Sequence, residues 1–404
     1  MCTAFGHLRW ANTELCTIHS PYYHYYFFCI TPVEKGNAVK FRCEREALAE
    51  ALGTASRAAT GRSGTLPVLT GLRLELVGDQ LSITGSDLDL TIRLTIEVGG
   101  EVDGRVVVPA RLAADIVRSL GAGKVDVAVE GNDVSISNGR SRFTVRPLSV
   151  DDYPMLPSGG SSSVTLPTAQ FGEALRQVVR AASNDESKKA ELTGVEMSAD
   201  DDGLRMVATD SYRLAVGHLV GQRVMDAGQK VIVPSRALNE LVRLLGHGDE
   251  VTMQLGDRHA SFTVGTVSLT TRLIEGTFPS ILHLIQQNDP KLLTVERDAL
   301  LEAIRRMKIL VKDATPLRLK LSGDVLRLEV ITQDVGNATE ELDAQYADSE
   351  VTIAFNPDYL SQGVEACEGD TVQLSIVDPG KPAVLRGVGH DNYLYLLMPV
   401  RVPG

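Results

Sequence analysis

The sequence predicts an α+β fold built from three tandem copies of one unit, each with two helices packed on antiparallel strands. Three observations support this prediction. Sequence markers recur at a nearly constant spacing, each unit repeats the same order of strand and helix patterns, and Pro and Gly bound the second helix of the first two units. At about 150 residues per domain, a chain of 404 residues suggests two or three domains.

The spacing of the markers establishes the repeat. A strand with alternating apolar residues begins three times, with separations of 123 and 122 residues, at Gly71, Gly194 and Pro316. The next strand keeps those separations, at Leu81, Leu204 and Leu326. A strand-to-helix junction recurs in the same order, at Pro109, Pro234 and Asn356. Three markers that stay in step over two periods indicate homologous units of roughly 120 residues.

Within each unit the elements follow from local patterns. A short strand leads into a helix with apolar residues at helical spacing, such as Phe171, Leu175 and Val178. A second helix starts after Pro109 or Pro234 and ends before a glycine. Segments rich in Pro, Gly and Ser separate the units. The predicted domains are 39–158, 162–286 and 290–404.

Residues 1–38 differ from the rest of the chain in composition. They hold the single Trp, three of the five Cys and four of the ten Tyr. Their apolar run is too short to span a membrane, and they have neither the aliphatic core nor the cleavage site of a signal peptide. We expect a non-native or disordered extension, with the true chain starting at Val39. A membrane-binding or partner-binding arm is the alternative.

Composition and motifs limit the function classes. The formal net charge of −12 excludes nucleic-acid binding by bulk charge, so any such role needs a local basic surface or a topological link. The Cys spacing predicts neither a disulfide framework nor a zinc site. GAGK at residues 121–124 follows a helix and precedes a strand, which is the wrong order for a phosphate loop. No catalytic motif, metal or cofactor is predicted.

Four segments, together with the tripled unit, carry a resemblance to a known family. They are TLPVL at 65–69, ATDSYRLAV at 208–216, EGTFPS at 275–280 and LMPVRV at 397–402. From residue 39 to its end the chain resembles the bacterial DNA polymerase III sliding clamp, the beta subunit. The resemblance implies the DNA clamp fold, with two chains joined head to tail in a homodimeric ring around double-stranded DNA.

The resemblance also implies a role and a set of partners. The chain would be a non-catalytic processivity factor of DNA replication, located in the cytoplasm and at the nucleoid, with no membrane contact. Its partners would be the DNA polymerase III catalytic subunit, the clamp loader, other polymerases, ligase and mismatch-repair proteins. Two alternatives stay open: an accessory or antibiotic-tolerant second clamp copy, and an acidic repeat enzyme or adhesion protein.

Basic residues on the predicted helices are candidates for contact with DNA phosphates. They are Arg57, Arg62, Arg111, Arg118, Arg176, Arg180, Lys188, Lys189, Arg236, Arg243, Arg305 and Arg306. Without the resemblance, a solvated helix face favoured by the helix dipole would be the better interpretation. With it, we expect weak sliding contacts that do not read sequence.

The resemblance places a pocket for partner peptides between the second and third units. The residues carried over are Leu192, Thr209, Arg213, Leu214, Pro279, Leu284, Asn356, Tyr359, Leu396, Met398, Pro399, Val400 and Arg401. An apolar pocket with a polar rim suits one or two anchor side chains, although leucines on strands alone would indicate plain core. Ser211 and Tyr212 replace the Gly-His pair often found in the family.

The resemblance also places a subunit interface at opposite ends of the chain. In the first unit it would use Arg140, Arg142, Phe143 and Val145. In the third unit it would use Ile309, Leu310, Glu340 and Glu341. An apolar centre with opposite charges at the rim fits a heterologous contact, and two ordinary amphipathic edges are the alternative.

Overall fold

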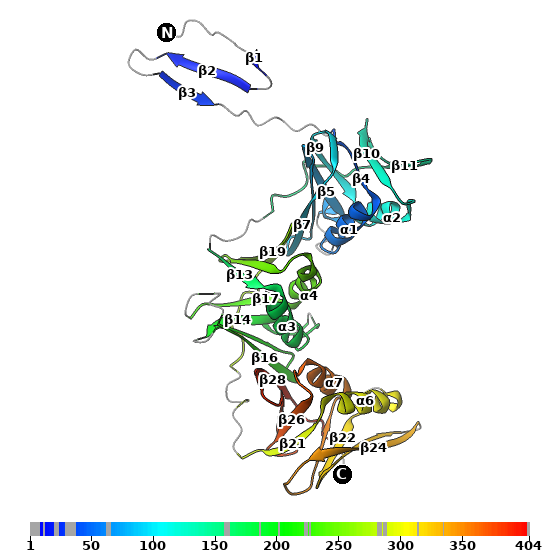
Figure 1. Cartoon of the computed structure of the whole chain (residues 1–404), viewed down its shortest axis with the longest axis vertical. Coiled ribbons are helices and arrows are strands. Elements are labelled where there is room, and N and C mark those ends of the chain that lie inside the picture. The colour runs from blue at the N-terminus through cyan, green and yellow to red at the C-terminus, as the bar shows by residue number, and fades with distance from the viewer. Residues whose placement is uncertain are drawn as a thin grey trace.

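The computed structural model describes residues 9–10, 13–19, 24–28, 38–61, 66–156, 162–185, 187–200, 203–221, 225, 228–280, 285, 289–312, 315–333 and 335–401. Three units follow one another along the long axis, and the chain curves (Figure 1). The helix pairs α1–α2, α3–α4 and α6–α7 lie toward the concave side, and strands form the convex side. The predicted α+β fold of three tandem units is confirmed.

The first unit has two helices, α1 (Arg45–Ser56) and α2 (Ala110–Ser119), and a 3-10 turn η1 (Pro67–Thr70). Its strands are β4 (Lys40–Glu44), β5 (Gly71–Val77), β6 (Gln80–Ser86), β7 (Leu90–Glu97), β8 (Gly99–Val102), β9 (Gly104–Pro109), β10 (Lys124–Glu130), β11 (Asp133–Asn138) and β12 (Ser141–Val145).

The second unit repeats this order with α3 (Thr168–Val179), α4 (Ser235–Leu244) and the 3-10 turns η2 (Ala190–Thr193) and η3 (Leu245–His247). Its strands are β13 (Ser162–Pro167), β14 (Gly194–Asp200), β15 (Gly203–Thr209), β16 (Arg213–Val220), β17 (Lys230–Pro234), β18 (Glu250–Leu255), β19 (His259–Val264) and β20 (Val267–Arg272).

The third unit contains α6 (Arg297–Met307), α7 (Pro357–Ala366) and the turn η4 (Lys308–Leu310). Its strands are β21 (Lys291–Glu296), β22 (Leu317–Ser322), β23 (Val325–Thr332), β24 (Gly336–Gln345), β25 (Val351–Phe355), β26 (Thr371–Ile376), β27 (Ala383–Gly387) and β28 (His390–Leu397).

Strand pairing joins neighbouring units into continuous sheets. One sheet runs β13-β18-β19-β20-β7-β6-β5-β9, with β20 of the second unit paired antiparallel to β7 of the first. Another runs β17-β14-β15-β16-β28-β27-β26-β21-β24-β23-β22-β25, with β16 of the second unit paired to β28 of the third. Both junctions therefore use the same two strand positions of the repeat.

The core lies between the helices and the sheets. On α3, Phe171, Leu175 and Val178 are fully buried, and the ring of Phe171 stacks 6.3 Å from that of Phe262 on β19. Alternation along β5 buries its leucines while the intervening residues stay partly exposed. The helical and alternating patterns in the sequence thus predicted the buried faces.

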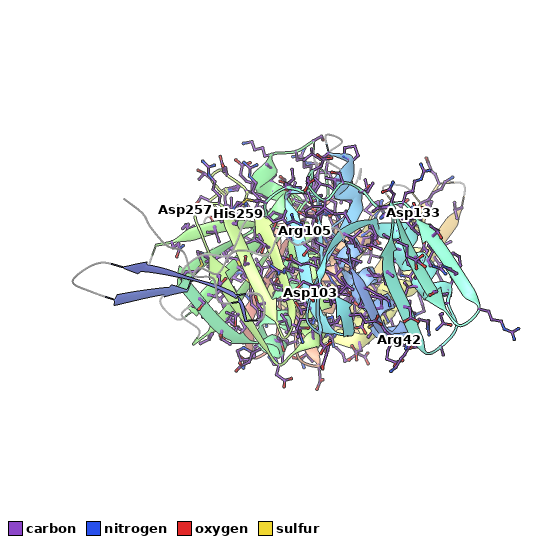
Figure 2. The ribbon with its side chains drawn as sticks, turned by 90° about the horizontal axis from the view of Figure 1, so that it is seen from above. Arg42, Asp103, Arg105, Asp133, Asp257 and His259 are labelled. Carbon is purple, nitrogen blue, oxygen red and sulfur yellow. The ribbon has the colours of Figure 1, made fainter. Side chains whose placement is uncertain are left out.

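The remaining strands, β1 (Arg9–Trp10), β2 (Thr13–His19) and β3 (His24–Phe28), pair only with one another. The prediction that residues 1–38 are a non-native or disordered extension stays a prediction. Seen from above, labelled charged side chains come from strands and turns of the first two units, with Arg42 and Asp133 on one side and Asp257 and His259 on the other (Figure 2).

Candidate functional site

The junction of the second and third units has an apolar floor. Leu214 on β16 faces Leu396 on β28, and each is 2% exposed. They belong to a separate apolar cluster that also contains Val207, Val216, Ile232, Phe278, Val384 and Leu394. Leu192 and Thr209 are buried as well. The side chains of these members of the predicted pocket are covered, so a pocket formed here would have them as its floor.

Exposed apolar side chains lie next to this apolar cluster in the sequence, after the end of β28 and after Phe278. Met398 is 39% exposed and Val400 36% exposed, and Pro279 is exposed too. Backbone bonds fix the segment, since the Met398 N–H donates to the Tyr212 carbonyl at 2.9 Å and the Val400 N–H to the Ala354 carbonyl at 2.8 Å. A ligand would therefore meet a fixed rim. Leu284, also predicted here, lies outside the described residues.

A buried ion pair lies at the start of β16, next to Tyr212. The Arg213 Nε donates to Asp210 Oδ2 at 3.1 Å, and the two side chains are 7% and 8% exposed. The guanidinium also donates to Gln362 on α7 and lies 4.4 Å from the ring centroid of Tyr359. Arg213 thus ties β16 of the second unit to α7 of the third.

The turn before Arg213 is held in an uncommon backbone conformation. Ser211 has φ of 78°, in the left-handed region that favours glycine. Asp210 Oδ1 accepts the N–H groups of Tyr212 and Arg213 at 2.9 and 3.0 Å. The Lys188 Nζ donates to the Asp210 carbonyl at 3.0 Å and lies 4.8 Å from the Tyr212 ring centroid. Tyr212 is therefore fixed at the rim although it is half exposed.

Asn356 has a structural task in addition to its predicted contact role. Its Oδ1 accepts the N–H groups of Asp358 and Tyr359, at 2.9 and 3.2 Å, and so caps α7. The Tyr395 hydroxyl donates to the Tyr359 carbonyl at 3.0 Å, and burial raises the pKa of the Tyr395 phenol. Tyr395 therefore remains a neutral donor that anchors α7. Pro399 is partly exposed and Arg401 exposed at the end of the described chain.

Several predicted DNA-facing cations pair across the junctions between units. Arg57 lies 3.5 Å from Glu240, Arg180 lies 2.5 Å from Glu365, and Arg236 lies 2.7 Å from Asp87. Each pair joins two neighbouring units. These arginines therefore make contacts between units, which the sequence interpretation did not predict. Arg62 lies outside the described residues.

The other predicted cations divide into paired and unpaired groups. Arg118, Arg176 and Arg243 each pair with an acid three residues earlier on their own helix. Arg306 forms ion pairs with Glu340 and Glu302. The Lys188 Nζ donates to the Asp210 carbonyl. Among the predicted DNA-facing cations that the structure describes, three are exposed and have no ion-pair partner: Arg111, Lys189 and Arg305. Arg57 and Arg118 line one groove of about 340 Å³ between α1 and α2.

The predicted subunit-interface residues lie at the β11–β12 hairpin of the first unit and on η4 and β24 of the third. Phe143 is 38% exposed on β12, the edge strand of the sheet β12-β11-β10-β4-β8, and Val145 is buried beside it. Ile309 is 81% exposed in η4. Some of the charges already have partners within the chain, since Arg142 pairs with Glu130 at 2.5 Å and Glu341 with Arg327. Arg140 is exposed in the β11–β12 turn, and Leu310 is half-buried.

Sequence reasoning missed two features of the junctions. Gln362 and Phe278 contribute to the second junction, and a cavity containing Asp87 and Arg236 lies at the first. Among the residues that the structure describes, no cluster could hold a metal ion, and no helix is long and apolar enough to cross a membrane.

Family models match almost all of the chain beyond residue 38. The models describe the N-terminal, central and C-terminal domains of the DNA polymerase III beta subunit, and they match residues 39–157, 165–280 and 283–401. Each predicted unit therefore corresponds to one domain model.

Individual relatives give the same result. The chain is 34% identical over 378 residues to a beta sliding clamp of Streptomyces coelicolor, covering 91% of this chain and 100% of the relative. It is 29% identical to a beta sliding clamp homolog named GriR from Streptomyces muensis, covering 90% and 99%. A crystal structure of the C. crescentus beta sliding clamp, with polyethylene glycol at a putative beta-motif tethering region, superimposes with a TM-score of 0.86 at 29% identity, covering 91% and 100%.

Proposed function

The chain belongs to the family of the DNA polymerase III beta subunit, the bacterial sliding clamps, and on that premise we propose that two copies close head to tail into a ring around duplex DNA. Members of this family are non-catalytic processivity factors of DNA replication, and the chain shares that role. The finer proposals concern how the ring closes, how it is kept on DNA and how it holds partners.

The repeated junction supports ring closure. At the first junction β7 pairs with β20, placing Ile92 opposite Leu269, and at the second β16 pairs with β28, placing Ala215 opposite Tyr395. The equivalent strands are β24 of the third unit, which pairs with β21 only at residues 344–345, and β12 of the first, which pairs with β11. Transferring the register pairs β24 with the partner's β12, so that Ala338 would face Phe143 of the partner subunit.

A substitution at Phe143 tests this closure. Phe143→Asp places a charge at the centre of the proposed contact, and Val102→Asp is the matched control on β8, at the opposite edge of the same sheet. Sedimentation should give twice the chain mass of 43.6 kDa for the wild type and V102D, and the single chain mass for F143D. A dimer of F143D, or a monomeric wild type, would contradict the proposal.

A closed ring explains how an acidic chain can stay on DNA. Retention by topology needs little affinity, so a few weak phosphate contacts on the concave side suffice. Arg305 is exposed and unpaired within the described residues, whereas Arg118 pairs with Asp115 at 3.0 Å. Arg305→Ala should lower the salt slope of binding to a short duplex by about 1, and Arg118→Ala by less. Equal slopes for all three proteins would exclude a phosphate contact by Arg305.

We further propose that polymerases, the clamp loader, ligase and mismatch-repair proteins dock linear peptides on the rim of Tyr212, Met398 and Val400. The covered leucines beneath the rim support a depression for an apolar anchor. Met398→Lys should shorten the products of the DNA polymerase III core in primer extension at least tenfold. Met155→Lys, which changes a 99% exposed methionine between the first two units, is the control. Full-length products with M398K would refute the docking site.

The chain would act at the nucleoid in the cytoplasm. The second candidate role is that of an accessory clamp copy. It is favoured by the similarity to GriR, the beta sliding clamp homolog of Streptomyces muensis. Deletion of the gene separates the two roles, because loss of a main clamp stops replication and loss of an accessory copy does not.

A further inference from the structure

The two junctions of the chain join strands at the same positions of the repeat, β7 with β20 at the first and β16 with β28 at the second. The backbone contacts beside these strands match as well. The Arg272 N–H donates to the Asp89 carbonyl at 2.9 Å, as the Met398 N–H does to the Tyr212 carbonyl. The side-chain contacts of the two junctions can therefore be compared position by position.

Buried side chains tie the second junction together. Arg213 of the second unit donates to Gln362 on α7 of the third, and Arg213 is 7% exposed. Gln177 of α3, which is 4% exposed, donates to the Ala366 carbonyl at 3.2 Å and to the Glu368 carboxylate at 3.0 Å. Both ties end on α7 or just after it, so they resist a change in the angle between the second and third units.

The equivalent positions of the first junction hold different side chains. Leu90 stands in the place of Arg213, and its aliphatic side chain can donate no hydrogen bond to α4. Thr54 stands in the place of Gln177, and its hydroxyl accepts from Arg57 of the same unit at 3.1 Å. Among the residues that the structure describes, the first junction thus has neither of these two ties.

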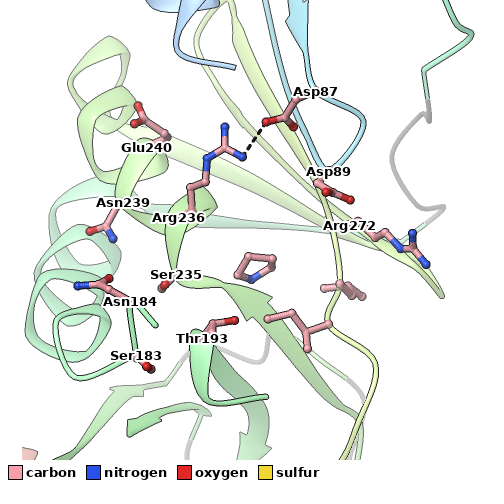
Figure 3. Close-up of a pocket in the computed structure, with 13 residues that line it drawn as sticks. Asp87, Asp89, Ser183, Asn184, Thr193, Ser235, Arg236, Asn239, Glu240 and Arg272 are labelled. Atoms are coloured by element: carbon pink, nitrogen blue, oxygen red, sulfur yellow. Dashed lines mark ion pairs between the residues drawn. The ribbon is translucent and has the colours of Figure 1, made fainter. Parts of the chain in front are cut away.

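A cavity of about 790 Å³ lies at the first junction, lined by Asp87 and Asp89 of the first unit and by α4 of the second (Figure 3). Glu240 of α4, at the position of Gln362, also lines it. The Glu240 Oε2 is buried and has no hydrogen-bond partner within the described chain. The Arg57 Nε lies 3.5 Å from this oxygen, beyond ordinary hydrogen-bond length. A junction with such a void has fewer packing contacts that oppose bending.

An ion pair spans this cavity. Arg236, in the first turn of α4, reaches Asp87 of the first unit at 2.7 Å (Figure 3). Asp87 is fixed in its own unit, because it accepts the Thr60 hydroxyl at 3.0 Å and the Leu90 N–H at 2.9 Å. Arg236 is 34% exposed, so water can replace Asp87 as its partner at little cost. The pair can therefore open and re-form without unfolding either unit.

We propose that the chain bends at the first junction. The strands β7 and β20 stay paired and form the axis, the cavity gives α4 room to move, and the ion pair between Asp87 and Arg236 is the latch that holds one angle. The second and third units turn together as one body. A ring of two such chains, if it closes as proposed above, would yield at this junction when it is opened. The proposal concerns an angle within one chain, so it can fail or succeed independently of ring closure.

Distances between spin labels on the full chain test the proposal. Labels on Ala47 of α1 and Gln170 of α3 report on the first junction, and labels on Gln170 and Thr352 of β25 report on the second. All three residues are exposed. The labels are attached through an unnatural amino acid, which leaves the native cysteines unlabelled. Labelled chains are mixed with a large excess of unlabelled chain, so that only distances within one chain are measured.

Arg236→Met removes the latch. Arg180→Met is the matched control, because it removes the similarly exposed ion pair with Glu365 across the second junction. In R236M the distribution of the 47–170 distance should become at least twice as wide as in the wild type, while the 170–352 distribution keeps its width. R180M should broaden neither distribution, because Arg213 and Gln177 still tie the second junction.

Two results would overturn the proposal. One is an unchanged width of the 47–170 distribution in R236M, which would mean that strand pairing alone sets the angle. The other is equal broadening at both junctions in R236M, or broadening of the 170–352 distribution in R180M, which would make the second junction as soft as the first. Asp87→Asn breaks the same ion pair from the other side and should broaden the 47–170 distribution too. Far-UV circular dichroism that matches the wild type shows that a broader distribution reports bending and not unfolding.

Discussion

Replacing Asp210 by Asn should cost much more than the same change at Asp87, although the two residues are equivalent in the repeat. Asp210 and Arg213 are both more than nine-tenths buried, and their contact is 3.1 Å. In Asp210→Asn the guanidinium keeps its charge but loses its counter-ion, and an amide N–H group can face the Arg213 Nε. Removing one partner of a buried pair typically costs about 3–5 kcal/mol.

Asp87 provides the control because its cationic partner can reach water. Arg236 is 34% exposed, so in Asp87→Asn it can be resolvated and the cost should stay near 1 kcal/mol. Hydrogen exchange of the backbone amides measures the local opening free energy. The amides to follow are those paired between β15 and β16 in D210N, and those paired between β6 and β7 in D87N.

Exchange should accelerate by about two to almost four orders of magnitude in D210N and by about fivefold in D87N, since 1.4 kcal/mol is about a factor of ten. An acceleration below tenfold in D210N, or equal effects of the two changes, would refute the reasoning about burial.

Three further predictions concern single groups. The hydrogen bond from Arg306 lowers the pKa of Glu340 below its ordinary value of 4.5. The contribution of this pair to stability is therefore present above pH 4.5 and is lost as the pH falls through the lowered pKa of Glu340. Glu340→Gln should lower the melting temperature at pH 7 but not at pH 3. Burial raises the pKa of Cys367 to about 12, so its thiol should react with Ellman's reagent at pH 8 only at the rate of unfolding, and rapid reaction in the native protein would contradict this. Ser211→Gly should stabilise the chain by about 1 kcal/mol because φ is 78°, and denaturant unfolding that shows no gain would exclude backbone strain there.

The repeat and the helices were predictable from sequence because their signals are local or periodic. Pro109 and Pro234 immediately precede α2 and α4 as predicted, and the apolar spacing of Phe171, Leu175 and Val178 lies on α3. Leu310 keeps the apolar spacing of the helix before it, but it lies in η4, because α6 ends at Met307. The start of a helix is strongly marked by proline, and its last turn is marked weakly.

The partners of charged side chains were not predictable because the contacts are non-local. Arg180 binds Glu365 across 185 residues of sequence, and only the pairing of β16 with β28 brings them together. In the sequence Arg236 is one of several basic residues on predicted helices, and no local pattern indicates its partner. In the structure the pairing of β7 with β20 places Asp87 beside it. The leucines of the proposed partner site were predicted by resemblance, and their covered position required the structure.

Loading onto circular DNA tests the central proposal of a closed, sliding ring most directly. The protein is incubated with its clamp loader, ATP and nicked circular plasmid, then gel-filtered before and after the plasmid is cut once. We expect it to elute with the circle and to be lost from the linear DNA, and we expect F143D to fail to stay on either. Protein that remains bound after linearisation, or wild-type protein that never loads, would contradict topological retention.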